Sequence, residues 1–199
     1  YLSHNFKNKT IMKKVLLTVA AVMAFGLMNA QEVKYGAKAG LNLSNLAGDV
    51  ENADMKVGFQ VGGFAEIKVS DKFAVQPELL FSNLGTKVDF DGTTVTENLN
   101  YVVVPVMAKY FAAEKFSIEA GPQIGLKKKT KAKADGESVD IKDEFNSTDF
   151  GLNVGFGYDF TENIGVGLRY TAGLSNIAKD SGDFKVNNTN IALTVGYKF

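Results

Sequence analysis

The stretch that decides the fold is Asp-Phe-Gly-Leu-Asn-Val-Gly-Phe-Gly-Tyr-Asp-Phe, residues 149–160. Its even positions carry hydrophobic side chains, and its odd positions carry Gly, Asn or Asp. Because the side chains of a β-strand alternate between two faces, the stretch predicts a strand with one apolar and one polar face. Its length is typical of a tilted strand that crosses a bilayer.

Seven more segments alternate in the same way, which predicts eight strands in all. Their polar faces are rich in Gly, Gln, Asn, Ser and charged residues, and small residues suit the narrow lumen of an eight-stranded barrel. We therefore expect an all-β fold, an eight-stranded antiparallel transmembrane up-and-down β-barrel. The seven segments are 33–43, 57–69, 73–85, 101–111, 116–126, 164–174 and 189–199.

The connections between these segments alternate between long and short, as in a barrel with short periplasmic turns and longer outer loops. The short ones are 70–72, 112–115 and 161–163, and the long ones, expected outside the cell, are 44–56, 86–100, 127–148 and 175–188.

Two of the long connections contain Asp-Gly turn signals, at 91–92 and 135–136, and are expected to be hairpins. Counting back from the second turn pairs Lys131 with Asp140, Lys128 with Asp143, and Lys127 with Glu144.

The N-terminal part has the layout of a secretory signal peptide. Met12 is followed by Lys13 and Lys14, by an apolar run at 15–28, and by Ala30. The run is shorter than the roughly 20 apolar residues that a membrane-spanning helix needs. We expect residues 1–11 to be an over-extended start, 12–30 to be a signal peptide cleaved between Ala30 and Gln31, and 31–199 to be the barrel.

The residues expected in the barrel offer little for catalysis. The chain has no Cys, and its one His, His4, precedes the expected cleavage site, so the commonest bases and nucleophiles are missing. No enzyme activity, metal or cofactor is expected, and the absence of a basic excess argues against nucleic acid.

Charged residues on the polar face are instead expected to pair inside the lumen. Charges withdrawn from bulk water must pair or keep trapped water, and an acid–base pair of Glu78 and Glu119 is the competing interpretation. The predicted lumen ion network consists of Lys38, Glu66, Glu78, Lys109, Glu119 and Arg169, and further charges on the same face are Lys34, Lys68, Asp159 and Lys198.

Four sequence features together resemble the PorT-like outer-membrane β-barrel family of Gram-negative bacteria. They are Asn29-Ala30-Gln31, the strand 34–42, Val104-Pro105-Val106, and the ending Val195-Gly196-Tyr197-Lys198-Phe199. The resemblance implies the barrel fold and a place in the cell outer membrane, in contact with its lipid, but no common activity. The ending, with Tyr197 and Phe199, also looks like the signal read by the barrel-insertion machinery.

The sequence leaves three functional classes open. The favoured class is a structural or surface-interaction barrel with a plugged lumen, whose long loops contact a surface or envelope protein. A narrow porin-like channel for small solutes is the first alternative. A secreted soluble barrel that binds an apolar ligand is the second, and it would place the apolar faces inside.

Overall fold

The computed structural model describes residues 32–49, 53–90, 93–134, 137–140, 146, 148–178 and 185–199. The strands within these ranges are β1 (Glu32–Gly48), β2 (Ala53–Lys68), β3 (Phe73–Phe90), β4 (Thr93–Ala113), β5 (Phe116–Ala134), β6 (Glu137–Asp140), β7 (Thr148–Asp159), β8 (Ile164–Gly173) and β9 (Val186–Lys198). None of the described residues forms a helix long and apolar enough to cross a membrane. The expected signal peptide and its cleavage site between Ala30 and Gln31 lie outside the described residues.

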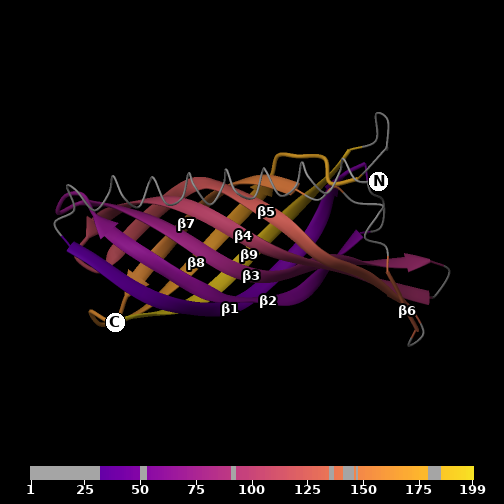
Figure 1. Ribbon diagram of the computed structural model, residues 1–199, viewed down its shortest axis with the longest axis horizontal. Helices are drawn as coiled ribbons and strands as arrows, with labels where there is room; N and C mark the ends of the chain where they lie inside the picture. Colours follow the sequence, from indigo (N-terminus) through magenta and orange to yellow (C-terminus); the bar gives the residue numbers. More distant parts are fainter. Residues whose placement is uncertain are drawn as a thin grey trace, which may run out of the picture.

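Eight of these strands close into an antiparallel barrel, which confirms the predicted fold. The sheet runs in the order β4-β3-β2-β1-β9-β8-β7-β5, and pairing of β4 with β5 closes the ring. The short strand β6 pairs with the last residues of β5, from Lys131↔Asp140 to Ala134↔Glu137. Figure 1 shows the tilted strands of the barrel and the β3–β6 segments that continue beyond it.

The two ends of the barrel differ. One end, here called the turn end, holds the short connections 69–72, 114–115 and 160–163, the start of β1 and the end of β9. The other, here called the hairpin end, is where β3, β4, β5 and β6 extend furthest. In Figure 1 the C-terminus marks the turn end and β6 marks the hairpin end.

The strands run longer than the alternation predicted, and they form the two hairpins expected at the Asp-Gly signals, since Phe90 pairs with Thr93 and Ala134 pairs with Glu137. Residues 86–90 and 93–100 belong to β3 and β4, and 127–134 belong to β5. These extensions are rich in Thr, Asn and Lys, so apolar and polar residues alternate less clearly in them than in the barrel segments. The predicted pairing of Lys131 with Asp140 is confirmed, whereas Asp143 and Glu144 lie outside the described residues.

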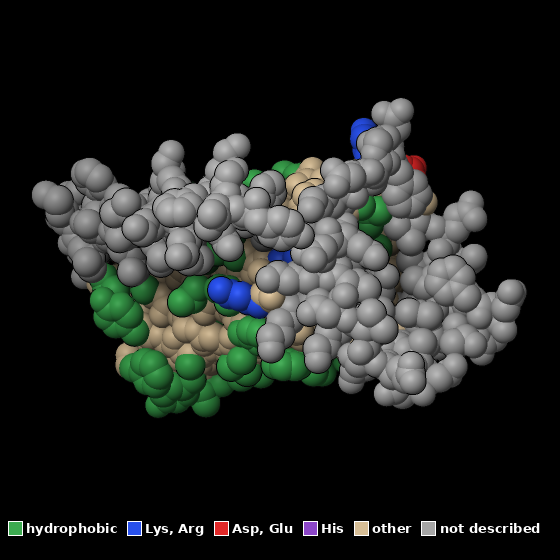
Figure 2. Space-filling view, turned by 45° about the vertical axis from the view of Figure 1, so that its right-hand side comes forward, with side chains coloured by type: hydrophobic (Ala, Val, Ile, Leu, Met, Phe, Trp, Pro, Cys, Tyr) green, Lys and Arg blue, Asp and Glu red, His purple; other side chains and the backbone are tan. Residues whose placement is uncertain are grey.

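The apolar faces of the strands point outward. Phe59, Leu79 and Leu193, from three different strands, are 50%, 57% and 58% exposed. Hydrophobic side chains gather on the outer wall that Figure 2 shows. Apolar surface in water is unfavourable by roughly 25 cal/mol per Å², so this wall suits hydrocarbon, whereas a soluble carrier of apolar ligands would have the opposite arrangement.

Candidate functional site

Eight of the charged side chains that the described strands turn into the lumen form two clusters, which are the candidate functional site. Strand alternation turns them inward, and the closure of the ring brings them together from strands far apart in the sequence. The central cluster consists of Lys38, Glu78, Glu119 and Arg169, and the turn-end cluster consists of Glu66, Lys109, Asp159 and Lys198.

Arg169 organises the central cluster. Its Nη1 and Nη2 donate to Glu78 Oε2 and Oε1, both at 2.9 Å, and its Nε donates to Glu119 Oε1 at 2.8 Å. Lys38 Nζ donates to Glu78 Oε1 at 2.8 Å. The Glu78 side chain is fully buried, so its charge is balanced by these two cations rather than by water.

Glu66 organises the turn-end cluster. Lys109 Nζ donates to Glu66 Oε2 at 2.6 Å, and Lys198 Nζ donates to Glu66 Oε1 at 3.1 Å. Lys198 Nζ also donates to Asp159 Oδ2 at 2.9 Å. Gln76 joins the two clusters, because its Oε1 accepts from Lys109 at 3.2 Å and its Nε2 donates to Glu78 at 2.6 Å.

Each cluster contains two cations and two carboxylates, so each is formally neutral. Taking unpaired charges out of water costs several kcal/mol per ion, whereas a closed set of pairs recovers most of that cost. All six residues of the predicted lumen network lie in these clusters. Asp159 and Lys198 complete the sets, while Lys34 and Lys68 pair with the partly exposed Glu32 at the rim, at 3.2 and 3.1 Å.

The competing acid–base interpretation of Glu78 and Glu119 meets a specific obstacle. Both carboxylates bind the same guanidinium, that of Arg169. They are therefore held as partners of a fixed cation at the centre of the barrel. None of the described residues belongs to a group of three or more His, Cys, Asp or Glu that could hold a metal ion.

Phe64 is an inward residue that the sequence reasoning missed. It is 8% exposed, and Lys38 Nζ lies 5.3 Å from its ring centroid. The ring fills the space over Gly36, where a Cβ atom would lie 2.3 Å from Phe64 Cζ and 2.5 Å from the Tyr197 carbonyl oxygen. Its even-numbered position in the 57–69 segment was the available signal, since Gly62 and Glu66 share that face.

A second missed feature closes the hairpin end of the lumen. This apolar layer is a buried cluster of Leu46, Leu80, Leu84, Leu99, Tyr101, Val103, Ile177 and Val186. Leu99 and Ile177 are 0% exposed and Tyr101 is 1% exposed. Positions 80 and 84 are on the polar face of segment 73–85, so the signal was present but was masked by Gln76, Glu78 and Ser82.

Ile177 enters the apolar layer from the connection between β8 and β9. Its backbone N–H donates to the Val186 carbonyl at 2.8 Å, and its carbonyl accepts from Asn146 N at 2.7 Å. Beside it, Asn188 Nδ2 donates to Asp149 Oδ2 at 2.7 Å and to the Tyr101 hydroxyl at 3.3 Å. No periodic signal marks a loop residue that packs into a barrel mouth.

Comparisons with known proteins agree with this geometry. The outer membrane protein beta-barrel domain family matches residues 29–179. This chain belongs to that family. It is accordingly a protein of the cell outer membrane, and its outward apolar wall contacts membrane lipid. No curated protein matches the chain.

Solved outer-membrane barrels share this family fold. Ail, the attachment invasion locus protein of Yersinia pestis, is 18% identical, with 85% of this chain and 100% of that one covered and a TM-score of 0.55. Neisserial surface protein A is 14% identical over the same shares, with a TM-score of 0.59. A further structure of Ail, in complex with the heparin analogue sucrose octasulfate, is 16% identical over the same shares, with a TM-score of 0.52.

The outer-membrane barrel also carries aromatic side chains around its turn end. Ring pairs there include Phe73–Tyr110 at 5.0 Å and Tyr197–Phe199 at 5.6 Å between centroids. Tyr197 and Phe199, the predicted insertion signal, are 48% and 75% exposed on the outer wall. Aromatic rings of this kind sit at the boundary between hydrocarbon and head groups.

Proposed function

We propose that this outer-membrane barrel has a plugged lumen and acts as a structural or surface-interaction protein through its hairpin end. The turn end faces the periplasm, because both ends of the barrel segment and the short connections lie there. The observation that carries the proposal is the filled lumen, in which two neutral ion clusters lie below an apolar layer. No catalytic role is proposed.

The contents of the lumen argue against the alternative function, a porin-like channel. Ions would have to separate the Arg169–Glu78 pair and then pass Leu99, Tyr101 and Ile177, which are almost fully buried. In planar bilayers we expect the purified protein to show no stable channels. Regular, long-lived conductance steps from heat-modifiable, folded protein would contradict the plug.

The hairpin end offers a candidate ligand class for the surface role. The complex of Ail with a heparin analogue suggests sulfated glycans, and β5 carries Lys128, Lys129, Lys131 and Lys133 near this end. Cells displaying the protein should bind heparin beads, and added salt should weaken that binding because it screens the attraction between lysine and sulfate groups.

A matched pair of variants tests this ligand class. Changing Lys128, Lys129, Lys131 and Lys133 together to Gln should abolish heparin binding. Changing four lysines at the turn end to Gln removes the same charge and should leave the binding intact; these are Lys34, Lys68, Lys72 and Lys115. Equal binding by both variants would exclude the β5 lysines as the site.

The proposal extends to export and assembly. Residues 12–30 act as a signal peptide, 31–199 form the mature barrel, and Tyr197 with Phe199 addresses the barrel-insertion machinery, in line with the PorT-like resemblance. Intact-mass measurement of protein from outer membranes should give a chain that begins at Gln31. A mature chain that retains residues 12–30 would contradict the signal-peptide assignment.

A further inference from the structure

Three cavities lie in series along the lumen. The mouth cavity, of about 820 Å³, opens at the turn end and reaches Asp159 and Lys198. The middle cavity, of about 50 Å³, shares those two residues and extends to Lys38 and Glu119. The upper cavity, of about 20 Å³, begins at Arg169. Ion pairs therefore separate each cavity from the next.

The middle cavity follows a wall from which side chains are missing. Its lining includes Gly157, Gly165, Gly167 and Gly196, which belong to β7, β8 and β9. A Cβ atom at Gly196 would meet nothing closer than 3.6 Å, so at that position the glycine leaves real space, whereas the side chains of Ser117, Asp159 and Thr194 occupy the corresponding space at Gly157, Gly165 and Gly167. Gly196 lines the middle cavity together with Lys198 and Thr194, so the open space lies beside Lys198 on the side of the mouth cavity.

The lysines around the middle cavity have hydrogen-bond donors to spare. An ammonium group has three N–H donors, but the described residues accept one hydrogen bond from Lys38 Nζ and two each from Lys109 and Lys198. A buried donor without an acceptor costs about 1–3 kcal/mol. Water supplies acceptors without upsetting the neutral clusters, and about 50 Å³ holds a few water molecules at ~10–15 Å³ each.

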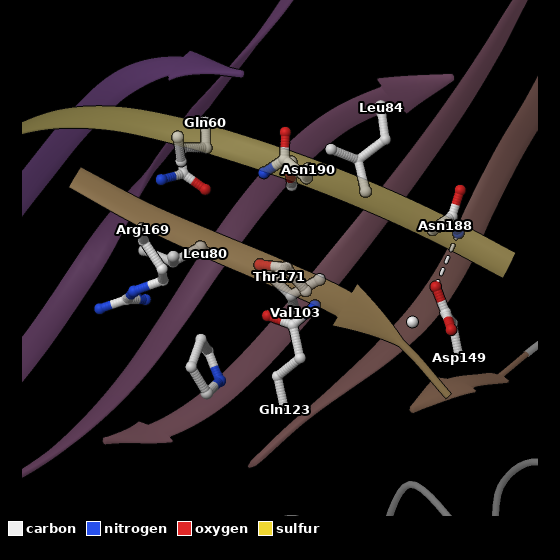
Figure 3. Close-up of a pocket in the computed structure, with 14 residues that line it drawn as sticks. Gln60, Leu80, Leu84, Val103, Gln123, Asp149, Arg169, Thr171, Asn188 and Asn190 are labelled. Atoms are coloured by element: carbon white, nitrogen blue, oxygen red, sulfur yellow. Dashed lines mark hydrogen bonds between the residues drawn. The ribbon is translucent and has the colours of Figure 1, made fainter. Parts of the chain in front are cut away.

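The upper cavity differs from the other two because the apolar layer closes it toward the hairpin end. Leu80, Leu84 and Val103 of the apolar layer line it. Figure 3 shows Arg169 at one end and the Asp149–Asn188 hydrogen bond at the other. Its size suits about one water molecule, and the Asn190 Oδ1 atom, which is buried without a hydrogen-bond partner among the described residues, would accept from it.

We propose that the barrel is a one-sided vestibule: water and solutes of its size enter from the turn end along the glycine wall and stop at Arg169. The inference rests on the plugged lumen proposed above, and it adds which part of that lumen contains water. The central cluster is the floor of the vestibule, and the apolar layer keeps the remaining lumen dry from the hairpin end.

The absence of Cys in the chain permits a direct test with single cysteines. Thr194→Cys places a thiol in the middle cavity, and Thr171→Cys places one in the upper cavity. The two make the same chemical change on either side of Arg169, because Thr194 pairs with Gly167 and Thr171 pairs with Asn190. The probe is Ag⁺, which is small enough for the open space beside Lys198, added in chloride-free buffer to folded protein in detergent micelles.

Solution contacts both ends of the barrel in a micelle, so the reaction rate reports how accessible each cavity is and not which side of a membrane it faces. The rate of the Ag⁺ reaction is followed by unfolding samples at intervals and labelling the remaining free thiol with maleimide. Thr194→Cys should react at least about 100-fold faster than Thr171→Cys, because Ag⁺ reaches the latter only when the barrel opens locally. Adding Gly196→Val to Thr194→Cys should slow its reaction at least about tenfold by filling the open space beside Lys198. Unmodified Cys-free protein measures the background.

The remaining outcomes separate this inference from the plug. Fast reaction at both positions would overturn the vestibule, because solution would then reach the upper cavity as well, and the bilayer recordings decide separately whether the plug also fails. Slow reaction at both positions would overturn the vestibule but not the plug. The vestibule would also be overturned if Thr171→Cys reacted faster than Thr194→Cys, or if Gly196→Val left the rate at Thr194→Cys unchanged. If either threonine variant does not fold, Ser117→Cys, opposite Gly157, and Ser82→Cys, on the upper cavity, repeat the comparison.

Discussion

The ion clusters make a quantitative prediction about stability, tested best by Glu78→Gln. The substitution keeps the size of a fully buried side chain but removes a charge that binds Lys38 and Arg169. Removing one partner of a buried ion pair typically costs 3–5 kcal/mol. Arg169 loses Glu78 but still binds Glu119, whereas Lys38 loses its one carboxylate partner among the described residues. We therefore expect the free energy of unfolding to fall by about 3 kcal/mol, the lower end of that range.

The matched control is Glu32→Gln, which removes the same charge at the rim. Glu32 lies 3.2 Å from Lys34 and 3.1 Å from Lys68, but its side chain is 44% exposed. Exposed pairs contribute about 0–1 kcal/mol, so this variant should unfold almost like the unchanged protein. The two variants differ in burial rather than in chemistry.

The assay is urea unfolding in lipid vesicles, followed by far-UV circular dichroism and heat-modifiable gel mobility. Linear extrapolation converts the midpoints into free energies of unfolding. A double variant, Glu78→Gln with Lys38→Met, should recover most of the loss because it removes the stranded cation as well. If Glu78→Gln lies within about 0.5 kcal/mol of Glu32→Gln, the central cluster does not stabilise the barrel in the way its geometry implies.

Four further predictions follow from the same structure. Gly36→Ala should destabilise the barrel by about 1–3 kcal/mol through contact with Phe64 and the backbone, while Gly196→Ala stays within about 0.5 kcal/mol of the unchanged protein; urea unfolding compares them. Protease added to intact cells should cut the hairpin-end connections and spare the turn-end ones, and the reverse pattern by mass spectrometry would invert the barrel. Deleting Phe199 should lower the amount of folded protein in outer membranes, measured by heat-modifiable mobility, without preventing refolding of purified protein in detergent. Replacing all four central-cluster residues with Leu or Met should leave the refolded barrel as stable as before or more so but reduce its outer-membrane yield; an unchanged yield would contradict a role of these charges before insertion.

The sequence predicted the faces of the strands better than their ends. Alternation is local, so Phe150, Leu152 and Val154 could be placed on one face without knowing the neighbours of β7. Strand ends depend instead on whether a neighbouring strand continues to offer hydrogen bonds. The extensions of β3, β4 and β5 do so beyond the segments with clear alternation, and only the Asp-Gly turn signals predicted that hairpins continue there.

The lumen network was predictable in its members but not in its pairs. Arg169 and Glu78 are 91 residues apart, and their contact depends on the stagger of all eight strands around the ring, which a single strand does not encode. The contribution of Ile177 was harder still, because it comes from a connection with no periodic pattern. Local sequence thus identifies many of the side chains that face inward, but their contacts across the lumen depend on how the barrel closes.

The charged lumen also has a physical reason that stability alone does not supply. Well-packed apolar residues can replace buried ion pairs at little or no cost, and the apolar layer does fill the hairpin end of this barrel. A strand that is apolar on both faces, however, forms a continuous hydrophobic run that is prone to aggregate before it is inserted. Inward charges keep each strand half polar during passage through water, and the mean hydropathy of −0.04 reflects that balance. Closure of the ring then pairs the charges into neutral clusters, so the same residues that keep the unfolded chain soluble fill the lumen of the folded barrel.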